Sequence, residues 1–574
     1  MKKITYSLII LVGIGLFSCT KDWDKLNKNP NQLEKPSPEQ IMNFVFKSTI
    51  DQMAQNNMSF FWAYAHHLTV TASRYNTQSE QNWRNMYINV LGNLNQMQIL
   101  YAKDPNYNNR VQIAKIWECY VYAYLVGLYG PIPLSEAMST SQSIKYDSEN
   151  EVYRELLIRL KAAGEAITPN GDKLTQDVVL NGNNARWKKF ANSLRLRIAL
   201  RCIRNQPDEA ITAIQELMGN ETELLTSNSD NVKMSYGAGD VNESPYYTRL
   251  VRNPVVDGLK PKLSNYLFTY FRSFEDPRLN AYFESPAYEF RPNVIDTLSS
   301  TQDDTLRVVS YRIPHLGQNK TTAPLPAWGI TGSNPLSGVL VTGYSDPKPF
   351  ILADNYAFKI MDYAEICFLK AEASELGYIG NRSSEQYYYE GIEANMNAWS
   401  IYDTQAVSSY KSRNGVKWGT SNAGMFDVFG VVRTGMPAED ITKARIQQWI
   451  NYYPDGAFDA WCLQRATQSL NLPPLTNSGN QFLSSDVTDI PDRWEYPLSA
   501  KSYNPLGYTN AVASIGGIDY PNVILNFAVP PQRINWKNIS GFYNPSASLK
   551  QYGTTIQGLI AAGIPYTVQS KFKR

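Results

Sequence analysis

The sequence predicts a mainly α-helical protein with long irregular loops and a few short hairpins. Apolar side chains recur at helical spacing through the first 220 residues and again between residues 354 and 402. Gly and Pro follow several of these periodic segments and end the predicted helices. The regions between them are rich in Pro, Gly, Asn and Ser and hold only short alternating apolar runs, so no large sheet is expected.

The helical pattern is clearest in three segments. Residues 110–129 are apolar nearly all round, and the sequence Gly-Pro-Ile-Pro at 130–133 then stops the helix. Residues 187–201 place apolar side chains at i, i+3, i+4, i+7 and i+11, which predicts an amphipathic helix with arginines on most of its remaining surface. Residues 356–376 carry alanines on the apolar stripe, so we expect a slim helix that packs closely.

The same spacing predicts further helices. They cover residues 41–55, 82–101, 150–166, 209–218, 261–273, 385–399 and 441–453. Several form pairs in which large and small apolar residues alternate as in tetratricopeptide units, although no clean period of about 34 residues emerges.

The N-terminus carries the features of a lipoprotein signal peptide over residues 1–18. Lys2 and Lys3 precede an apolar run that is too short to span a bilayer. The closing sequence Leu-Phe-Ser-Cys resembles the bacterial lipobox, in which the cysteine, here Cys19, is lipidated and becomes the first residue. Each buried methylene of an acyl chain contributes about 0.8 kcal/mol to membrane binding, so lipidation alone would anchor the protein. The alternative is an ordinary signal peptide that is cut elsewhere.

The mature chain divides into a tether and one domain. Residues 19–38 are polar and Pro-rich, which indicates a flexible tether. Residues 39–574 form a single helical domain with loop insertions near 220–350, 404–436 and 466–530, where short alternating runs predict small hairpins, for example at 306–313 and 338–341. Loops of this length in a compact protein are usually functional surfaces.

Charge and aromatic content narrow the range of partners. The chain has 54 basic and 52 acidic residues, and loss of Lys2 and Lys3 with the signal peptide leaves a neutral protein. A neutral chain without basic runs has no electrostatic attraction for polyphosphate, so nucleic acid is not an expected partner. The 38 tyrosines are the compositional excess, and tyrosine is an amphipathic contact residue.

Four cysteines remain after Cys19. Their spacing matches neither a zinc site nor a small disulfide scaffold, and each has large apolar neighbours in a helical pattern. We therefore expect buried free thiols, with one long-range disulfide as the alternative. The four residues are Cys119, Cys202, Cys367 and Cys462.

Catalytic constellations are sparse. The chain has three histidines, His66, His67 and His315, and shows no zinc helix, nucleophile elbow, phosphate loop or dinucleotide fingerprint. Paired carboxylates, as in glycoside hydrolases, could meet in space without leaving a sequence signal. We expect no catalytic residue and no cofactor, and a structural calcium ion stays an open question.

Aromatic and amide side chains in or beside polar loops are the candidate ligand contacts. Flat rings offer an apolar face to the C–H side of a sugar, and amides can bond its hydroxyl groups. The candidates are Tyr75, Asn76, Trp83, Trp328, Tyr344 and Trp418. Trp83 has a second interpretation, because Trp83, Tyr87, Val90 and Leu94 would line one helix face and form core.

Several blocks in their order along the chain resemble the SusD/RagB nutrient-binding lipoproteins of Bacteroidetes. They are the lipobox Cys19, YGPIPLSEA at 129–137, the helix at 187–201, FRSFEDPRL at 271–279, YAEICFLKAEA at 363–373 and PDRWEYP at 491–497. The family often has Asp where this chain has Pro131, a departure that concerns a turn. The resemblance covers essentially the whole mature chain.

The resemblance implies a tetratricopeptide-like scaffold, held by lipid at the outer membrane and facing the cell exterior. It implies capture of an oligosaccharide, which is passed without hydrolysis to a TonB-dependent transporter of the SusC type. The family's binding residues lie in variable loops, so the candidate contacts rest on the residues alone. Capture of peptides or another small nutrient, a glycoside hydrolase and a structural adhesin remain the alternatives.

Overall fold

We describe the chain from a computed structural model. The placed residues are 36–69, 75–141, 143–237, 239, 242–253, 261–264, 267, 270–271, 274–284, 288–290, 306–309, 339–341, 346–413, 415–420, 425–426, 432–433, 439–470, 472, 490–531 and 567–570. The predicted signal peptide, Cys19 and the tether up to residue 35 lie outside these described residues.

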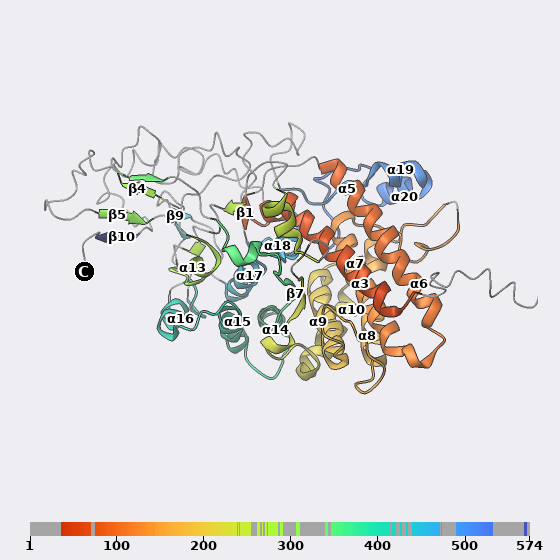
Figure 1. The fold of residues 1–574 in the computed structure, drawn as a ribbon, viewed down its shortest axis with the longest axis horizontal. Coiled ribbons are helices and arrows are strands. Elements are labelled where there is room, and N and C mark those ends of the chain that lie inside the picture. The colour runs from red at the N-terminus through yellow and green to blue at the C-terminus, as the bar shows by residue number, and fades with distance from the viewer. Residues whose placement is uncertain are drawn as a thin grey trace, which may run out of the picture.

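Helices dominate the fold and follow one another as packed neighbours (Figure 1). The first group is α3 (Pro38–Asn56), α4 (Trp62–Tyr64), α5 (Tyr75–Arg84), α6 (Gly92–Tyr101), α7 (Asn108–Tyr129), α8 (Glu149–Ala166), α9 (Asn184–Cys202) and α10 (Pro207–Gly219). The second group is α11 (Pro245–Tyr247), α13 (Arg278–Tyr282), α14 (Tyr363–Glu375), α15 (Ser384–Ala398), α16 (Thr404–Lys411), α17 (Asp440–Asn451), α18 (Ala457–Thr467), α19 (Leu498–Tyr503) and α20 (Pro505–Ser514).

Short π and 3-10 segments join or extend these helices. The π segments are η1 (Asn57–Phe61), η2 (Asn85–Leu91) and η6 (Thr248–Arg252). The 3-10 segments are η3 (Pro105–Tyr107), η4 (Glu221–Glu223), η5 (Asn228–Asp230) and η7 (Pro349–Leu352). Because η2 links α5 directly to α6, residues 75–101 form one continuous helix.

Strands occur only as small antiparallel pairs among the described residues. The pairs are β1 (Leu68–Thr69) with β3 (Lys262–Leu263), β2 (Val232–Met234) with β7 (Phe358–Met361), β4 (Tyr288–Phe290) with β6 (Val339–Val341), β5 (Leu306–Val309) with β10 (Thr567–Ser570), and β8 (Met425–Phe426) with β9 (Val432–Arg433). The strands predicted near 306 and 338 are present, but neither pairs locally. Leu306 faces Ser570, and Val339 faces Phe290.

Local sequence explains where the main helices begin and end. Ser37, Ser148 and Ser383 each form a capping box with the Gln or Glu three residues later, which satisfies two free backbone N–H groups. Gly130 ends α7 with a φ of 83°, a left-handed conformation that favours glycine, and donates its N–H to Val126. The mainly helical class predicted from periodicity is confirmed.

Four predictions of local structure need correction. The segment predicted as a helix from 356 begins as strand β7, and Asp362 then caps α14 by accepting the N–H of Glu365. Likewise, the predicted helix at 261–273 starts with strand β3. Helices α16, α19 and α20 lie in regions predicted as loops, because helices this short give too few turns for a periodic signal.

The arginines of α9 are the fourth correction. We expected them on the outer surface, yet Arg195, Arg197 and Arg201 are all buried. Arg195 pairs with Glu216, whereas Arg197 and Arg201 share Asp459. Burial of a guanidinium is tolerated when a carboxylate compensates it, and these partners lie far away in the sequence.

The core is rich in aromatic rings and centres on α7. This helix packs against α6, α8 and α9, which explains why it is apolar on nearly every side. Six tryptophans of the described residues are fully buried, namely Trp62, Trp117, Trp187, Trp449, Trp461 and Trp494. Within the placed ranges, no helix combines the length and apolar character that a membrane crossing requires.

The four remaining cysteines are free and buried, which confirms the expectation of unpaired thiols. Burial raises the pKa of Cys119 and Cys202, and it raises the pKa of Cys367 to about 12. Because the thiolate is the reactive form, these groups should be unreactive while the protein is folded.

A thiol titration tests this prediction. In a soluble chain that begins at residue 20, we expect Ellman's reagent to label no cysteine in buffer and four cysteines in guanidinium chloride. Rapid labelling of any thiol in buffer would show that its helix opens far more readily than its burial indicates.

Candidate functional site

A large open groove lies between the α5–η2 helix and the hairpin formed by α19 and α20. Its volume is about 1140 Å³, slightly larger than that of typical small-molecule pockets, which reach about 1,000 Å³. The hairpin sits at one end of the molecule beside α5 (Figure 1). The lining residues from the helix are Ser79, Glu80, Trp83, Arg84, Tyr87 and Ile88; those opposite are 495–504 and Tyr508; and Pro133, Ala137, Ile144, Tyr146 and Asp519 complete the groove.

Hydrogen bonds hold the hairpin in place against the body. The side chain of Asn504 accepts the N–H of Gly507, which caps α20, and donates to the carbonyl of Ile144 at 2.7 Å. The N–H of Ser499 donates to Glu80 Oε2 at 3.1 Å. The chain therefore positions the second wall through bonds to α5 and to the loop before α8.

Trp83 is the centre of an aromatic cluster in the groove. Its ring centroid lies 4.7 Å from that of Tyr87, 5.0 Å from Tyr129, 6.0 Å from Tyr146 and 6.1 Å from Tyr496. Only 9% of Trp83 is exposed. Trp83 thus packs in the core, as its second interpretation predicts, and it also lines the groove, whereas its contact with a ligand stays a prediction.

The tyrosine hydroxyls that hold the cluster are bonded to backbone. Tyr87 donates to the carbonyl of Pro133 at 2.9 Å, and Tyr496 donates to that of Pro131 at 2.6 Å. Burial raises the pKa of Tyr87 and Tyr496, so both remain neutral donors. The rings are therefore fixed in orientation before any ligand arrives.

Polar and charged groups also lie along the groove. Asp519 is compensated by the buried Arg493, with Nη1 2.5 Å from Oδ1. Burial, with a contribution from Asp519, raises the pKa of Glu495. The buried Oγ of Ser499 makes no hydrogen bond to another described residue.

Hydroxyl and carboxyl side chains both line the groove, the carboxyl groups being those of Glu80, Glu495 and Asp519. Ser79, Ser499 and Ser502 lie in the groove, and neither of the two described histidines, His66 and His67, lines it. His67 is fully buried with Nε2 2.9 Å from the carbonyl oxygen of Trp449, and burial lowers its pKa to about 3. Among the placed residues no three His, Cys, Asp or Glu side chains gather to hold a metal ion.

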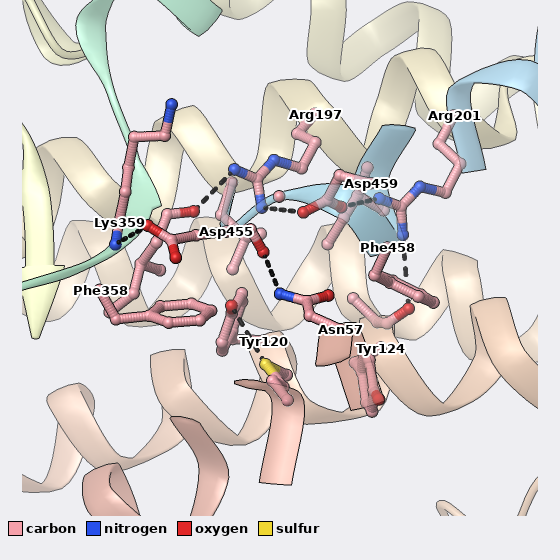
Figure 2. Close-up of a pocket in the computed structure, with 16 residues that line it drawn as sticks. Asn57, Tyr120, Tyr124, Arg197, Arg201, Phe358, Lys359, Asp455, Phe458 and Asp459 are labelled. Carbon is pink, nitrogen blue, oxygen red and sulfur yellow. Dashed lines mark hydrogen bonds and ion pairs between the residues drawn. The ribbon is translucent and has the colours of Figure 1, made fainter. Parts of the chain in front are cut away.

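A second pocket lies inside the body and has a structural role (Figure 2). Its volume of about 30 Å³ suits one water molecule. Arg197 points across it to Asp459, and Arg201 approaches the same carboxylate from the neighbouring turn of α9. The side chain of Asn57 donates to the carbonyl of Asp455 at 2.7 Å. These bonds join α9 and α18 to the rest of the core.

The structure places only some of the predicted contacts. Trp83 lines the groove, whereas Trp418 lies elsewhere, half-buried against Tyr388, with its backbone N–H donated to Tyr389. Tyr75 and Asn76 are the first residues of α5, and nothing is described of their side chains. Trp328 and Tyr344 fall outside the described residues, so their roles remain predictions.

Sequence reasoning missed most aromatic residues of the groove. They are Tyr146, Tyr496, Tyr503 and Tyr508. The excess of tyrosine signalled such residues in general, and Tyr503 and Tyr508 lie in a region predicted as a functional loop. The contact between that region and α5 could not be predicted, because some 420 residues separate Glu80 from Ser499.

The scaffold and its preformed aromatic groove define a helical binding protein. Residues 30–497 match the SusD-like family, described as starch-binding and associating with the outer membrane, and the chain belongs to this family. No curated protein matches the sequence.

Solved structures of SusD-like proteins share the fold. A chitin-binding protein is 21% identical with a TM-score of 0.67, over 86% of this chain and 100% of that one. A chitin-binding SusD homologue from Flavobacterium johnsoniae is 18% identical with a TM-score of 0.64, over 86% and 97%. A SusD-like protein from Bacteroides thetaiotaomicron is 19% identical with a TM-score of 0.66, over 86% and 99%. The tetratricopeptide-like helical fold expected from the sequence is thereby confirmed.

Proposed function

We propose that this protein is a cell-surface lipoprotein that captures an oligosaccharide and passes it to a partner TonB-dependent transporter of the SusC type. Acylation of Cys19 would hold it on the outer membrane, facing the exterior. Membership of a family described as starch-binding and outer-membrane-associated supports this proposal. The protein would bind its cargo without cleaving it.

The aromatic groove is the observation on which the proposal depends. Tyr503 is exposed and Tyr508 half-buried on its hairpin wall, where ring faces can stack on the C–H side of sugar rings. Glu495 and Arg84 also line the groove and can bond hydroxyl groups. An open groove of this volume accommodates an extended chain of rings better than one small molecule.

Calorimetric titration tests the ligand class. The protein is titrated with oligosaccharides of starch and of chitin, and with a panel of peptides. We expect heat with at least one glycan series. Heat with peptides alone would replace the sugar by a peptide cargo, and release of reducing ends from a glycan would reveal a hydrolase instead.

Replacement of Tyr503 by Ala should weaken glycan binding by about 1–2 kcal/mol, or roughly five- to thirtyfold in Kd. Because 85% of Tyr503 is exposed, the loss of its ring should not disturb folding. Tyr402→Ala is the matched control, since Tyr402 is also exposed (69%) but lies between α15 and α16, away from the groove. An equal effect of both variants would remove Tyr503 from the site.

A further inference from the structure

Exposed apolar side chains gather on and after the α19–α20 hairpin. Of the sixteen large apolar residues that are exposed in the described chain, six lie within residues 498–524, which makes this the densest such segment. We call these six the apolar ridge: Leu498, Tyr503, Leu506, Ile518, Tyr520 and Ile524. Concentrated exposed apolar surface of this kind marks an interaction site.

The ridge is also nearly free of charge. Between residues 498 and 524 only Lys501 and Asp519 are charged, whereas charged residues make up 18% of the chain. Asp519 is paired with the buried Arg493, and Lys501 Nζ lies 5.6 Å from the ring centroid of Tyr508. Depletion of charge together with exposed aromatic residues is typical of the centre of a protein–protein interface.

The hairpin is attached to the body so that its outer side stays uncovered. Ala500 is the only buried residue of α19, and Gly507 and Ala511 are the only buried residues of α20. The Tyr508 hydroxyl lies 3.3 Å from Asp519 Oδ2, which places the segment around 519 beside α20. The two halves of the ridge therefore belong to one region of the surface.

The ridge is continuous with the groove. Leu498 and Tyr503 line the groove, whereas Leu506, Ile518, Tyr520 and Ile524 do not. A partner seated on the outer residues would border the opening through which cargo leaves. A lipid surface is disfavoured, because interfacial binding relies on a row of basic residues and the segment has one lysine.

We infer that the part of the apolar ridge outside the groove, formed by Leu506, Ile518, Tyr520 and Ile524, docks an uncharged, apolar face of the partner transporter, next to the opening of the groove. This inference rests on the proposed function and adds the location of the contact. It separates cargo binding, on the inner side of the hairpin, from docking, on its outer side. The two roles can therefore be tested in different variants.

The test uses the double variant Leu506→Glu with Ile518→Glu, two residues that are 59% and 58% exposed and lie outside the groove. The tagged lipoprotein is purified from detergent-solubilised outer membranes of its native host, and the TonB-dependent barrel is identified and quantified by mass spectrometry. We expect at least a tenfold loss of the barrel, because each glutamate would bury an unpaired charge in the interface. Glycan affinity and Tm should stay unchanged.

Ile379→Glu is the matched control. Ile379 is 84% exposed in the turn between α14 and α15, which lie away from α19 and α20 (Figure 1). This variant should co-purify with as much barrel as the unaltered protein. A photo-crosslinking amino acid at position 506 or 518 should form an adduct with the barrel, and one at 379 should not.

Several results would overturn the inference. The first is that the double variant co-purifies with as much barrel as the unaltered protein. The second is that the crosslinker at position 506 forms an adduct with a second copy of this chain, and the third is that it forms an adduct with phospholipid. These results can be distinguished from failure of the proposed function itself. In that case the unaltered protein would co-purify with no TonB-dependent barrel, or it would bind no glycan.

Discussion

Replacement of Arg197 by Met is expected to destabilise the folded protein by about 3–5 kcal/mol. Arg197 is buried, with 4% of its side chain exposed, and it bonds Glu365 through two nitrogens at 2.5 and 2.6 Å. It also donates to the carbonyl of Ile360 at 3.0 Å and lies 3.4 Å from Asp459. One guanidinium thus joins α9 to β7, α14 and α18.

The large cost comes from the partner that remains. Burial already raises the pKa of Glu365, and the Coulombic attraction of Arg197 opposes this rise. Without Arg197 the Glu365 carboxylate must stay charged and uncompensated or take up a proton, and both outcomes lower the free energy of unfolding. Urea unfolding followed by tryptophan fluorescence measures the change.

Two further variants make this prediction specific. Arg382→Met removes an ion pair with Glu390 in which half of the arginine side chain is exposed, so its cost should stay below about 1 kcal/mol. The double variant Arg197→Met with Glu365→Gln leaves no unpaired charge at this pair and should be more stable than Arg197→Met alone. A cost below 1 kcal/mol for Arg197→Met would show that water reaches Glu365.

The arginines of α9 also show how far sequence reasoning extends. Periodicity placed Trp187, Phe190 and Leu194 correctly in the core. The same pattern assigned the arginines to the surface. A single sequence does not reveal that Glu365 and Asp459, far along the chain, contact the arginines of this helix. Local periodicity reports apolar faces, whereas compensated burial of charge depends on tertiary contacts.

The groove shows the same division. Trp83 could be recognised as a candidate because it follows a polar turn and begins an apolar helix face. Its neighbours Tyr146 and Tyr496 come from segments about 60 and 410 residues further along the chain. Only the fold brings these rings together. The presence of an aromatic site could therefore be predicted from the sequence, but the residues that form it could not.

The stability of this protein should also fall between about pH 4.5 and pH 7 through a single buried carboxyl group, that of Glu149. This residue opens α8 directly after the cap Ser148 and accepts the N–H groups of Asn526 and Phe527 at 2.7 and 2.8 Å. Burial raises its pKa from 4.5 to about 7, although both hydrogen bonds favour the charged form.

The direction of the effect follows from proton linkage. Because the pKa is higher in the folded state, the folded protein holds this proton more tightly than the unfolded chain. The resulting stabilisation is complete below about pH 4.5 and is lost as the pH rises through about 7. The loss amounts to roughly 1.4 kcal/mol per pH unit and roughly 3 kcal/mol in all.

Glu149→Gln isolates this contribution, since the amide does not titrate. Asp455, whose pKa burial raises to about 6, and His67 are unchanged in the variant, so their effects cancel in the difference. The unfolding free energy of the unaltered protein minus that of Glu149→Gln should fall by roughly 3 kcal/mol from pH 4.5 to pH 8.

Glu151→Gln is the matched control on the same helical turn and should show the opposite sign. Hydrogen bonds to Ser148 lower the pKa of Glu151 to about 2, so its stabilising effect is present above about pH 4.5 and is lost as the pH falls towards 2. Urea unfolding from pH 2 to 8 separates the two windows. A difference for Glu149→Gln that stays flat with pH would mean that the segment at 526–527 moves away and lets water solvate the carboxylate.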